Sequence, residues 1–391
     1  MTAPRRQHVR MTRRIVWLLA GLTACAVPES QHASPARQAD APVVSARARA
    51  RDLGIHIGKL RSGTNDAITD VLGVAVGHAT VREAGRLNTG VTIVLPHAGN
   101  PFRTKLPAAL VVQNGFGKLV GATQLQELGE LESAIALTAT LNVHRVADAV
   151  LDWLLGLPGN EKLRSANVVV GETNDGGLSD IRARAVGPEH VAAAIASAST
   201  GVVPVGSIGA GAGTTCFGWK GGIGTSSRRS GEYTVGVLVQ TNFGGQLNVR
   251  GLAETQQVAG LASRGIASVD HDGSCMIIIA TDAPLDQAGL RRLATRAFAG
   301  MARTGASFSH GSGDYAIAFS TARVAETRQR GPIQGGGLSP LFVAVADATE
   351  QAILDSLCAA QTTTGMGRTV RAMPLHGLKA RAGQGAERAA K

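Results

Sequence analysis

The chain has 391 residues, of which 44% are hydrophobic and 3% aromatic, and it contains 50 glycines. This apolar content is enough for the core of one or two domains, and it excludes a disordered chain, a collagen and a protein with many membrane-spanning helices. The formal charge of +11 lies in the tails: residues 1–51 carry +7 and residues 367–391 carry +5, whereas residues 52–366 carry −1. A neutral body with 13 aromatic residues argues against nucleic acid as a partner.

Residues 1–25 have the pattern of a bacterial targeting segment. Five arginines precede an apolar run that begins at Ile15 and is too short to span a bilayer as a stable helix. The run ends at Leu22-Thr23-Ala24-Cys25, which resembles a lipobox, where the cysteine is acylated and becomes the new N-terminus. We therefore expect an exported protein that is periplasmic or anchored to a membrane only through a lipid on Cys25.

Other interpretations of this segment remain open. They are an ordinary signal peptide cut nearby, an uncleaved N-terminal anchor, a start at Met11, and twin-arginine export through Arg13-Arg14. Residues 26–52 are rich in Ala, Ser, Pro, Gln and Arg, and we expect them to form a flexible linker.

From residue 53 to residue 377 short apolar runs alternate with helical patterns, which predicts one α/β or α+β domain built in layers, followed by a basic disordered tail over 378–391. The predicted strands are Gly73–Val76, Val91–Leu95, Ala108–Val112, Val168–Val170, Thr234–Val239, Met276–Ala280, Tyr315–Phe319 and Leu341–Val345. Three helices are predicted: one from Asn142 to Gly156, one from Pro284 to Gly305, and one with Asp347 and Glu350 in a capping-box spacing at its start.

The common catalytic and cofactor-binding motifs are absent from the sequence. There is no G-x-S-x-G elbow, no phosphate-binding G-x-x-x-x-G-K-[ST], no H-E-x-x-H and no C-x-x-C, so neither a metal nor an organic cofactor is expected. The glycine-rich stretch Gly206–Gly224 lacks the G-x-G-x-x-G spacing. It is better explained as a loop in which backbones pack closely than as a phosphate cradle.

The segment around Gly273 and Ser274 is the most informative. A polar stretch over 244–273 ends at Gly-Ser and runs directly into an apolar strand. A break between Gly273 and Ser274 would give Ser274 a free α-amine beside its hydroxyl, and this amine can act as the base that activates Oγ. Glycine before the bond would allow a strained backbone and leave its carbonyl open to attack in an N-to-O acyl shift. Taken alone, a Gly-Ser pair before a strand is usually only a turn.

Seven blocks of the chain together resemble the P1 (DmpA/BapA-type) family of self-processing aminopeptidases, over nearly all of residues 53–376. The blocks, in the family's order, are Asn65–His78, Asn114–Val143, Gly171–Ala183, Gly209–Arg228, Tyr233–Gly244, Asp272–Leu285 and Gly311–Thr321. The resemblance implies an N-terminal-nucleophile hydrolase with a four-layer α/β/β/α sandwich. It also implies self-cleavage at 273/274 into an α chain ending at Gly273 and a β chain of residues 274–391, and a homo-oligomer, a tetramer of such α–β units.

The resemblance assigns roles to single residues. Ser274 matches the nucleophile, and Ser312 matches a second serine that helps to move the proton. Asp314 matches the acidic residue that orients this network, and Asn242 matches the oxyanion-hole amide, a neutral donor for the charge that develops on the attacked carbonyl. Glu172 matches the carboxylate that holds the free ammonium of the substrate, which is the basis of aminopeptidase specificity.

The chain departs from the family at two positions near Glu172. Asn174 stands where some members have Tyr, so a phenolic contribution to the oxyanion hole would be missing or replaced by an amide. Gly177 stands where a bulky aromatic residue is common, which predicts a larger or looser pocket. His310 beside Ser312 invites a Ser-His-Asp interpretation, but a triad needs an orienting acid as well. Cys275 is expected in the core, because successive strand residues face opposite sides.

The sequence therefore predicts a serine aminopeptidase or amidase that acts on short peptides, amides or esters with a free amine through an acyl-enzyme on Ser274. Two alternatives remain. One is an acyltransferase of the related ornithine acetyltransferase type, against which the serine nucleophile and the export segment both count. The other is a non-catalytic binding lipoprotein that keeps the fold and stays a single chain.

Overall fold

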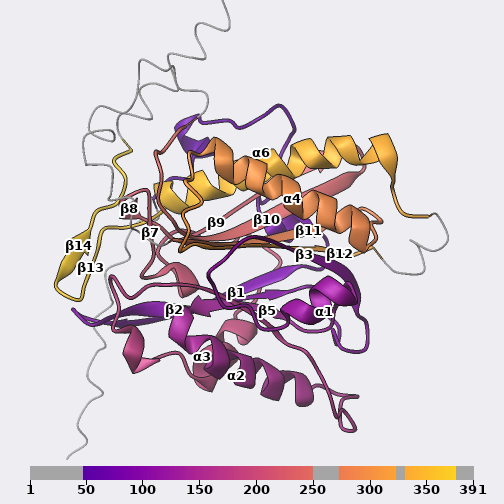
Figure 1. The fold of residues 1–391 in the computed structure, drawn as a ribbon, viewed down its shortest axis with the longest axis horizontal. Coiled ribbons are helices and arrows are strands. Elements are labelled where there is room, and N and C mark those ends of the chain that lie inside the picture. Colours follow the sequence, from indigo (N-terminus) through magenta and orange to yellow (C-terminus); the bar gives the residue numbers. More distant parts are fainter. Residues whose placement is uncertain (1–46, 250–272, 323–330, 376–391) are drawn as a thin grey trace, which may run out of the picture. The chain divides into compact units, whose positions relative to one another are not determined.

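Two β-sheets lie face to face, and helices cover the outer side of each (Figure 1). The computed structural model describes residues 47–249, 273–322 and 331–375. The layers run from α4 and α6 through the larger sheet and the smaller sheet to α2 and α3 (Figure 1). The predicted α/β/β/α sandwich is confirmed.

The larger sheet has six strands in the order β4-β3-β12-β11-β10-β9. β11 and β12 are parallel, and every other neighbouring pair is antiparallel. β11 and β12 are buried along their whole length, as expected for central strands covered on both faces. The strands are β3 (Leu106–Gly115), β4 (Glu130–Leu131), β9 (Ile223–Ser230), β10 (Tyr233–Asn242), β11 (Ser274–Thr281) and β12 (Gly313–Ser320).

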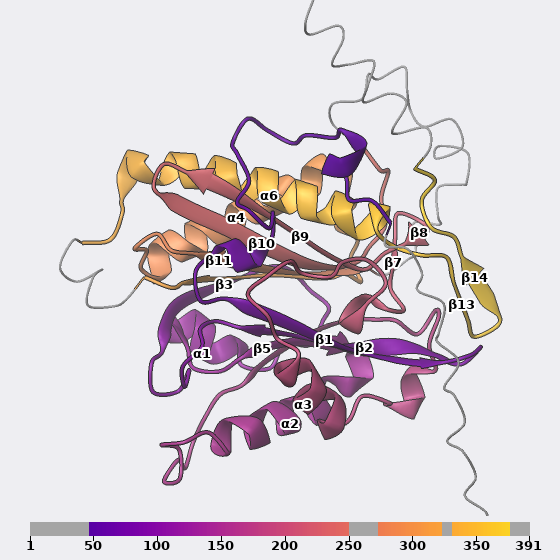
Figure 2. The ribbon, with the colours of Figure 1, turned by 180° about the vertical axis from the view of Figure 1, so that it is seen from behind.

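The smaller sheet has four strands in the order β1-β2-β5-β6, with β5 and β6 parallel. The strands are β1 (Ala75–Glu83), β2 (Leu87–Leu95), β5 (Ile135–Ala139) and β6 (Val169–Thr173). Two short hairpins, β7 (Thr215–Cys216) with β8 (Trp219–Lys220) and β13 (Thr363–Gly365) with β14 (Arg368–Val370), lie at one end of the sandwich (Figure 2).

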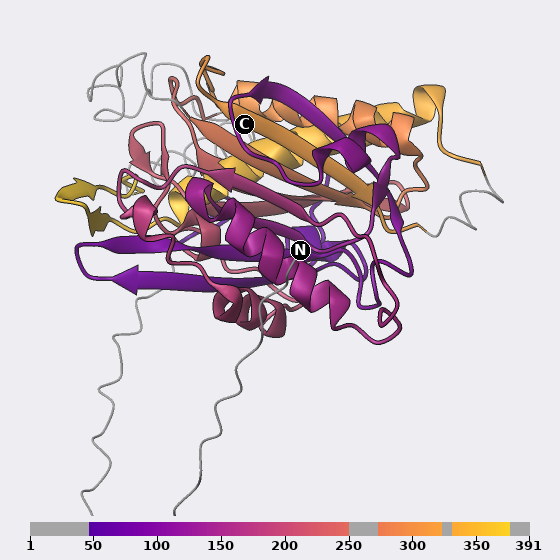
Figure 3. The same cartoon turned by 60° about the horizontal axis from the view of Figure 1, so that its bottom comes forward.

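The helices cover the sheets with apolar faces. The main ones are α1 (Ala122–Glu127), α2 (Val143–Leu155), α3 (Pro188–Ala196), α4 (Gln287–Arg303) and α6 (Ser339–Cys358). The helix predicted between Asn142 and Gly156 is confirmed as α2, which lies across the smaller sheet (Figure 3). The helix predicted after Pro284 is confirmed as α4, which begins where the Asp286 carboxylate accepts the Gly289 N–H at 2.8 Å.

Three apolar clusters hold the layers together. One lies between the two sheets and includes Met276 and Ile278 of β11. A second lies between the larger sheet and α4 and α6, and a third lies under α2 and α3. Residues of β11 therefore alternate between two cores: Cys275 and Ile277 face the helices, whereas Met276 and Ile278 face the other sheet.

The prediction of a strand at Leu341–Val345 is wrong, because these residues form the first turns of α6. α6 is buried on nearly every side from Ala344 to Cys358, so its apolar residues show no helical period, and a short apolar run cannot distinguish a buried strand from a buried helix. The predicted start of this helix at Asp347 is wrong for the same reason. Asp347 lies in its middle and pairs with Arg303 of α4 at 2.9 Å.

The last residues of the predicted linker are part of the fold. Ala50 is fully buried, and its N–H donates to the Asp355 carboxylate of α6 at 2.8 Å. The Arg49 guanidinium forms an ion pair with the same carboxylate at 2.6 Å. Residues 47–52 therefore anchor on α6, and the folded unit begins before residue 53.

Gly224 of β9 marks the closest approach of α6 to the larger sheet, because a side chain there would overlap the Ala352 carbonyl. We expect Gly224→Ala to lower the free energy of unfolding by about 1–3 kcal/mol, since the helix must move away from the sheet. Urea unfolding measures this. The matched control is Gly336→Ala, whose Cβ has no atom within 4 Å; equal stability of the two variants would contradict the prediction.

Candidate active site

The register of the central strands brings Ser274, Asn242 and the segment around Gly313 to the same end of the larger sheet. Ser274 is the first residue of β11 and lies opposite Asn242, the last residue of β10. On the other side of β11, Gly313 of β12 lies beside Ser274. Ser274 shares its face of the sheet with Met276, so its hydroxyl is on the side of the smaller sheet.

The chain is continuous through Gly273 and Ser274, and the bond between them is surrounded by hydrogen bonds. The Ser274 hydroxyl donates to the Gly273 carbonyl oxygen at 2.6 Å. The Gly313 N–H reaches the same carbonyl oxygen at 3.1 Å and the Ser274 Oγ at 3.3 Å. The hydroxyl of Ser274 therefore lies beside the carbonyl group of Gly273, which it would attack in self-cleavage. The Gly313 N–H already polarises that carbonyl.

A second reason for glycine at residue 273 comes from packing. A Cβ on Gly273 would lie 2.7 Å from the Cα of Phe243. Close approach of two backbones therefore excludes a side chain next to the predicted cleavage site.

Ser312 and Asp314 flank Gly313 at the start of β12 and are buried, with exposed fractions of 1% and 0%. Within the described ranges neither the Ser312 hydroxyl nor the Asp314 carboxylate has a hydrogen-bond partner at full bonding geometry. Burial raises the pKa of Asp314 to about 6, while the nearby Ser312 hydroxyl and the Cys275 N–H lower it. A buried acid with unused oxygens is thus available beside the N-terminal end of β11.

Asn242 has a fixed orientation. Its Oδ1 accepts the Thr215 N–H of β7 at 3.0 Å, and a backbone N–H can only donate, so the assignment of the amide oxygen follows from this contact. The remaining hydrogen-bonding group of the side chain is its NH₂, which is a donor. An NH₂ group at the level of Ser274 is what an oxyanion site requires.

Glu172 comes from the other sheet. It lies in β6, is 2% exposed, and accepts the Lys118 N–H at 3.0 Å and the Thr140 hydroxyl. Burial raises its pKa, and the two hydrogen bonds and the charge of Lys118 act in the opposite direction. Its carboxylate is therefore partly desolvated and is held by two hydrogen-bond donors, and the basic side chain whose charge lowers its pKa is that of Lys118.

The segment 116–118 connects β12 of the larger sheet to Glu172 on the smaller sheet. The Phe116 N–H donates to the Ser312 carbonyl at 3.0 Å, and the Gly117 N–H donates to the Tyr315 hydroxyl at 3.1 Å. The next N–H, that of Lys118, is the donor to Glu172. Three successive backbone N–H groups thus connect the N-terminal end of β12 to the Glu172 carboxylate on β6.

The remaining predicted residues have other environments. Asn174 is exposed, and its Oδ1 accepts the Gly176 N–H at 2.9 Å, so its carbonyl stabilises a local turn. Gly177 is also exposed. His310 is exposed, and its ring lies near that of Phe116. This environment does not favour a Ser-His-Asp triad. Cys275 is fully buried in the core under the helices, as predicted.

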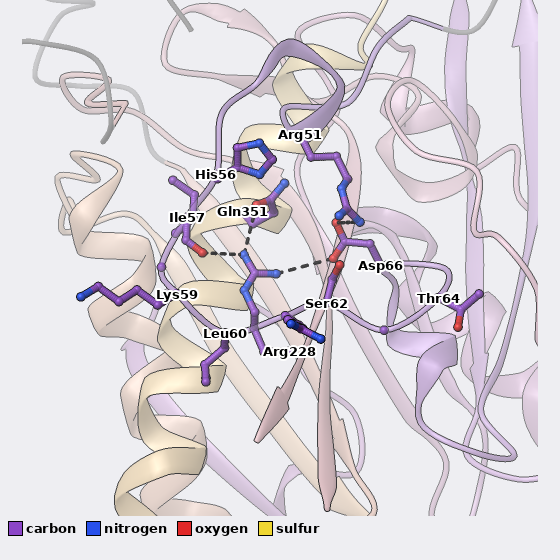
Figure 4. A pocket seen from close by; sticks show the side chains of 13 residues that line it. Arg51, His56, Ile57, Lys59, Leu60, Ser62, Thr64, Asp66, Arg228 and Gln351 are labelled. Atoms are coloured by element: carbon purple, nitrogen blue, oxygen red, sulfur yellow. Dashed lines mark hydrogen bonds and ion pairs between the residues drawn. The ribbon is translucent and has the colours of Figure 1, made fainter. Parts of the chain in front are cut away.

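A cavity of about 540 Å³ lies elsewhere, beside α6 and β9, and contains none of the residues above (Figure 4). It is formed by the segment 56–64 around Arg228, whose guanidinium donates to the Ile57 carbonyl and to Gln351 (Figure 4). Among the residues that the structure describes, no group of three His, Cys, Asp or Glu side chains could hold a metal.

Residues 66–370 match the model of peptidase family S58. The chain belongs to this family. It is 40% identical over 368 residues to the beta-peptidyl aminopeptidase BapA of Sphingosinicella microcystinivorans, which covers 85% of this chain and 91% of that one. BapA of Sphingosinicella xenopeptidilytica is 38% identical over 348 residues, which are 81% and 86% of the two chains.

Solved structures agree with this membership. A beta-aminopeptidase from a Burkholderia species has 36% identity and a TM-score of 0.76 over 87% of this chain and 99% of that one. The L-aminopeptidase D-Ala-esterase/amidase of Ochrobactrum anthropi, a variant of the Ntn hydrolase fold, has 31% identity and a TM-score of 0.75 over 86% and 98% of the two chains. This S58 member is thus a hydrolase, a self-processing aminopeptidase of the Ntn hydrolase fold.

Several predictions lie outside the described residues. They concern the targeting segment with Cys25, most of the linker and the tail over 378–391. Within 47–249, 273–322 and 331–375, no helix is long and apolar enough to cross a membrane.

The sequence analysis did not identify the residues that hold the site residues in place. Thr140 and the Lys118 N–H fix Glu172, Tyr315 fixes Gly117, and Thr215 fixes Asn242. Three of these contacts use a backbone N–H, which has no signature in a sequence. Only Tyr315 offered a signal, because it is one of two tyrosines in the chain and its hydroxyl stands in an otherwise apolar run, Tyr315–Phe319.

Removing the Tyr315 hydroxyl should loosen the segment that holds Glu172. We expect Tyr315→Phe to lower the free energy of unfolding by about 1–3 kcal/mol, because the Gly117 N–H loses its acceptor. KM for an amino acid p-nitroanilide should rise with little change in kcat. Denaturant unfolding and steady-state kinetics measure the two effects. Tyr233→Phe, at the far end of β10, is the control; a KM equal to that of wild type in Tyr315→Phe would contradict the connection.

Proposed function

We propose that Ser274 is the nucleophile both in self-cleavage and in the aminopeptidase reaction. The observation that carries this proposal is the hydroxyl of Ser274 at 2.6 Å from the Gly273 carbonyl oxygen. In cleavage, Oγ forms a bond to the Gly273 carbonyl carbon and the C–N bond to Ser274 breaks, which leaves an ester and a free amine. Water then hydrolyses the ester, releasing the Gly273 carboxylate and restoring the hydroxyl.

In the mature enzyme the new α-amine takes the proton from Oγ as the hydroxyl attacks the substrate carbonyl. Asn242 and the Gly313 N–H stabilise the oxyanion, and the ammonium or Ser312 gives a proton to the leaving amine. Water then attacks the acyl-enzyme, and the same groups act in reverse. Asp314, beside Ser312 and the start of β11, orients this proton network and compensates the positive charge of the ammonium.

Glu172 would select the substrate by its free amine. A substrate ammonium would give this buried carboxylate a direct ion pair, in addition to its two hydrogen bonds and the charge of Lys118. Relatives at 40%, 38% and 36% identity carry the names beta-peptidyl aminopeptidase or beta-aminopeptidase. We therefore infer that the substrates are short peptides and amides whose first residue is a β-amino acid.

We also infer that the protein is exported, to the periplasm or as a lipoprotein lipidated on Cys25, on the strength of the arginine-rich and apolar pattern of residues 1–25. A homo-oligomer, a tetramer of α–β units, remains a prediction from the family resemblance.

Ser274→Ala should abolish self-cleavage. Wild-type protein is expected to give two chains, the second beginning Ser-Cys-Met-Ile, whereas the variant stays a single chain because it has no hydroxyl to attack Gly273. Intact mass and N-terminal sequencing measure this, with Ser309→Ala as the control that still cleaves. A folded wild-type chain that stays uncut on incubation would remove the amine base and favour the non-catalytic binding protein.

Glu172→Gln should raise KM by about tenfold or more, since a hydrogen bond to a charged group contributes about 1.5–3 kcal/mol. In wild type, KM should rise as the pH falls towards the pKa of Glu172, which burial raises above its ordinary value of 4.5. Protonation there removes the negative charge that holds the ammonium, and the variant should lack this pH dependence.

Kinetics with β-alanine and L-alanine p-nitroanilides and their N-acetyl derivatives measure these effects, with Glu130→Gln as the surface control. Equal turnover of the acetylated and free substrates by wild type would contradict the role of Glu172. A preference for L-alanine would contradict the β-amino acid specificity alone.

A further inference from the structure

A fully buried lysine lies beneath the loop that orients Asn242. Lys220 is 0% exposed, and its ammonium donates to the carbonyl oxygens of Gly211 at 2.9 Å and Gly221 at 2.8 Å. The Thr214 hydroxyl donates to the same Gly211 oxygen at 3.2 Å. Burying an ammonium is costly unless it is hydrogen-bonded, so these contacts fix the positions of both carbonyls.

The two carbonyls flank a hairpin, β7–β8, that attaches to the end of β10. Phe217 and Gly218 form its turn with φ of 51° and 77°, which is the geometry of a tight two-residue hairpin. The Thr215 N–H donates to the Asn242 Oδ1 at 3.0 Å, and the Phe217 N–H donates to the Phe243 carbonyl at 2.8 Å. The hairpin therefore holds both the side chain of Asn242 and the backbone that follows it.

Lys220 acts where the hairpin begins and ends. It pairs with Thr215 across β7 and β8, so the residue that carries the ammonium is directly opposite the residue that binds Asn242. The Gly221 N–H donates to the Thr214 carbonyl at 3.0 Å, which closes the two chain ends on each other. Gly222 then pairs with Thr241, the neighbour of Asn242, through the Thr241 N–H at 3.0 Å.

A buried acid that follows β6 of the smaller sheet lies against the same loop. Asp175 is 1% exposed, lies three residues after Glu172, and packs with its Cβ against Gly213 of the same loop. Burial lowers the pKa of Lys220 to about 7 and raises that of Asp175 to about 7, and the charge of each counteracts the shift of the other. Within the described ranges the Asp175 carboxylate has no hydrogen-bond partner at full bonding geometry, and the nearby Thr89 hydroxyl, its own backbone N–H and the charge of Lys220 lower its pKa against the effect of burial.

We propose that Lys220 is a positioning residue for the reaction: it holds the β7–β8 hairpin so that Thr215 presents the amide of Asn242 to the oxyanion. Asp175, whose Cβ packs against Gly213, adds a contact between this loop and the segment that follows β6. This inference rests on the proposed role of Asn242. Lys220 itself touches no reacting group; it acts through the Gly211 and Gly221 carbonyls and the hairpin.

Replacing a residue that positions Asn242 should lower kcat, and this loss should disappear when Asn242 itself has been replaced. The oxyanion exists only after attack, so a displaced amide weakens transition-state binding and not substrate binding. We expect Lys220→Met to lower kcat about tenfold or more and to change KM less than twofold. Loss of the oxyanion donor itself, in Asn242→Ala, should lower kcat about 10²–10³-fold.

The test is a double-mutant cycle on the self-cleaved full-length enzyme, with kcat referred to active sites titrated by a sulfonyl fluoride and stability followed by thermal unfolding. Lys220→Met added to Asn242→Ala should cause less than a further twofold loss. Lys220→Gln, which keeps one neutral donor, provides the same comparison should the methionine variant not fold. Arg228→Met is the matched control: it removes another buried cation, opposite Val235 and seven residues along β10 from Asn242, and should lower stability without lowering kcat per active site.

Two outcomes would overturn the inference alone. One is an unchanged kcat in both Lys220 variants while Asn242→Ala has a lowered kcat. The other is that Lys220→Met lowers kcat by the same factor in the wild-type enzyme and in Asn242→Ala. A normal kcat in Asn242→Ala would instead overturn the proposed oxyanion role of Asn242, and the positioning role of Lys220 with it.

Discussion

The position of β11 between β10 and β12 is the constraint on which the site depends. Hydrogen bonds to both neighbours fix Ser274 opposite Asn242 and beside Gly313. A shift of one residue would turn every side chain of β11 to the other core, placing the Ser274 hydroxyl under the helices and Cys275 between the sheets. The alternation of Cys275 and Ile277 in one core with Met276 and Ile278 in the other excludes that shift. The geometry of the nucleophile is therefore a consequence of packing eight buried residues.

The second sheet supplies what one sheet cannot. The proposed nucleophile, oxyanion donors and proton network lie at the ends of β10, β11 and β12, whereas the carboxylate proposed to bind the substrate amine lies on β6. Glycines allow the segment 116–118 to approach β12: a Cβ on Gly117 would lie 2.6 Å from the Tyr315 ring, and one on Gly313 would lie 2.8 Å from the Cα of Gly117. The segment can therefore hydrogen-bond both to β12 and to Glu172 on β6, which fixes Glu172 relative to the start of β12.

The sequence was sufficient for the layers and for most strands, and it named residues that the fold brings together at the start of β11, because apolar runs bounded by glycines and a family's blocks are both local in the sequence. It failed where burial removes periodicity, as in α6, whose residues 341–345 are as apolar as a strand. It also failed where a residue acts through the backbone. Gly273 is needed for close contact with Phe243, and Asn242 is oriented by the N–H of Thr215, and neither reason can be read from the residue types involved.

Buried charge near the site supports the proposed selection of a substrate by its free amine. Glu172, Asp175 and Lys220 lie between or beside the sheets with exposed fractions of 2%, 1% and 0%. The charges of Lys220 and Asp175 each counteract the pKa shift that burial causes in the other, whereas Glu172 is held by two hydrogen-bond donors and the charge of Lys118. A ligand with a free ammonium offsets the cost of burying the Glu172 carboxylate. A ligand with a blocked amine increases this cost, because it excludes water and supplies no positive charge in its place. Discrimination then arises from leaving a buried carboxylate uncompensated, which is a stronger basis for specificity than the fit of an apolar pocket.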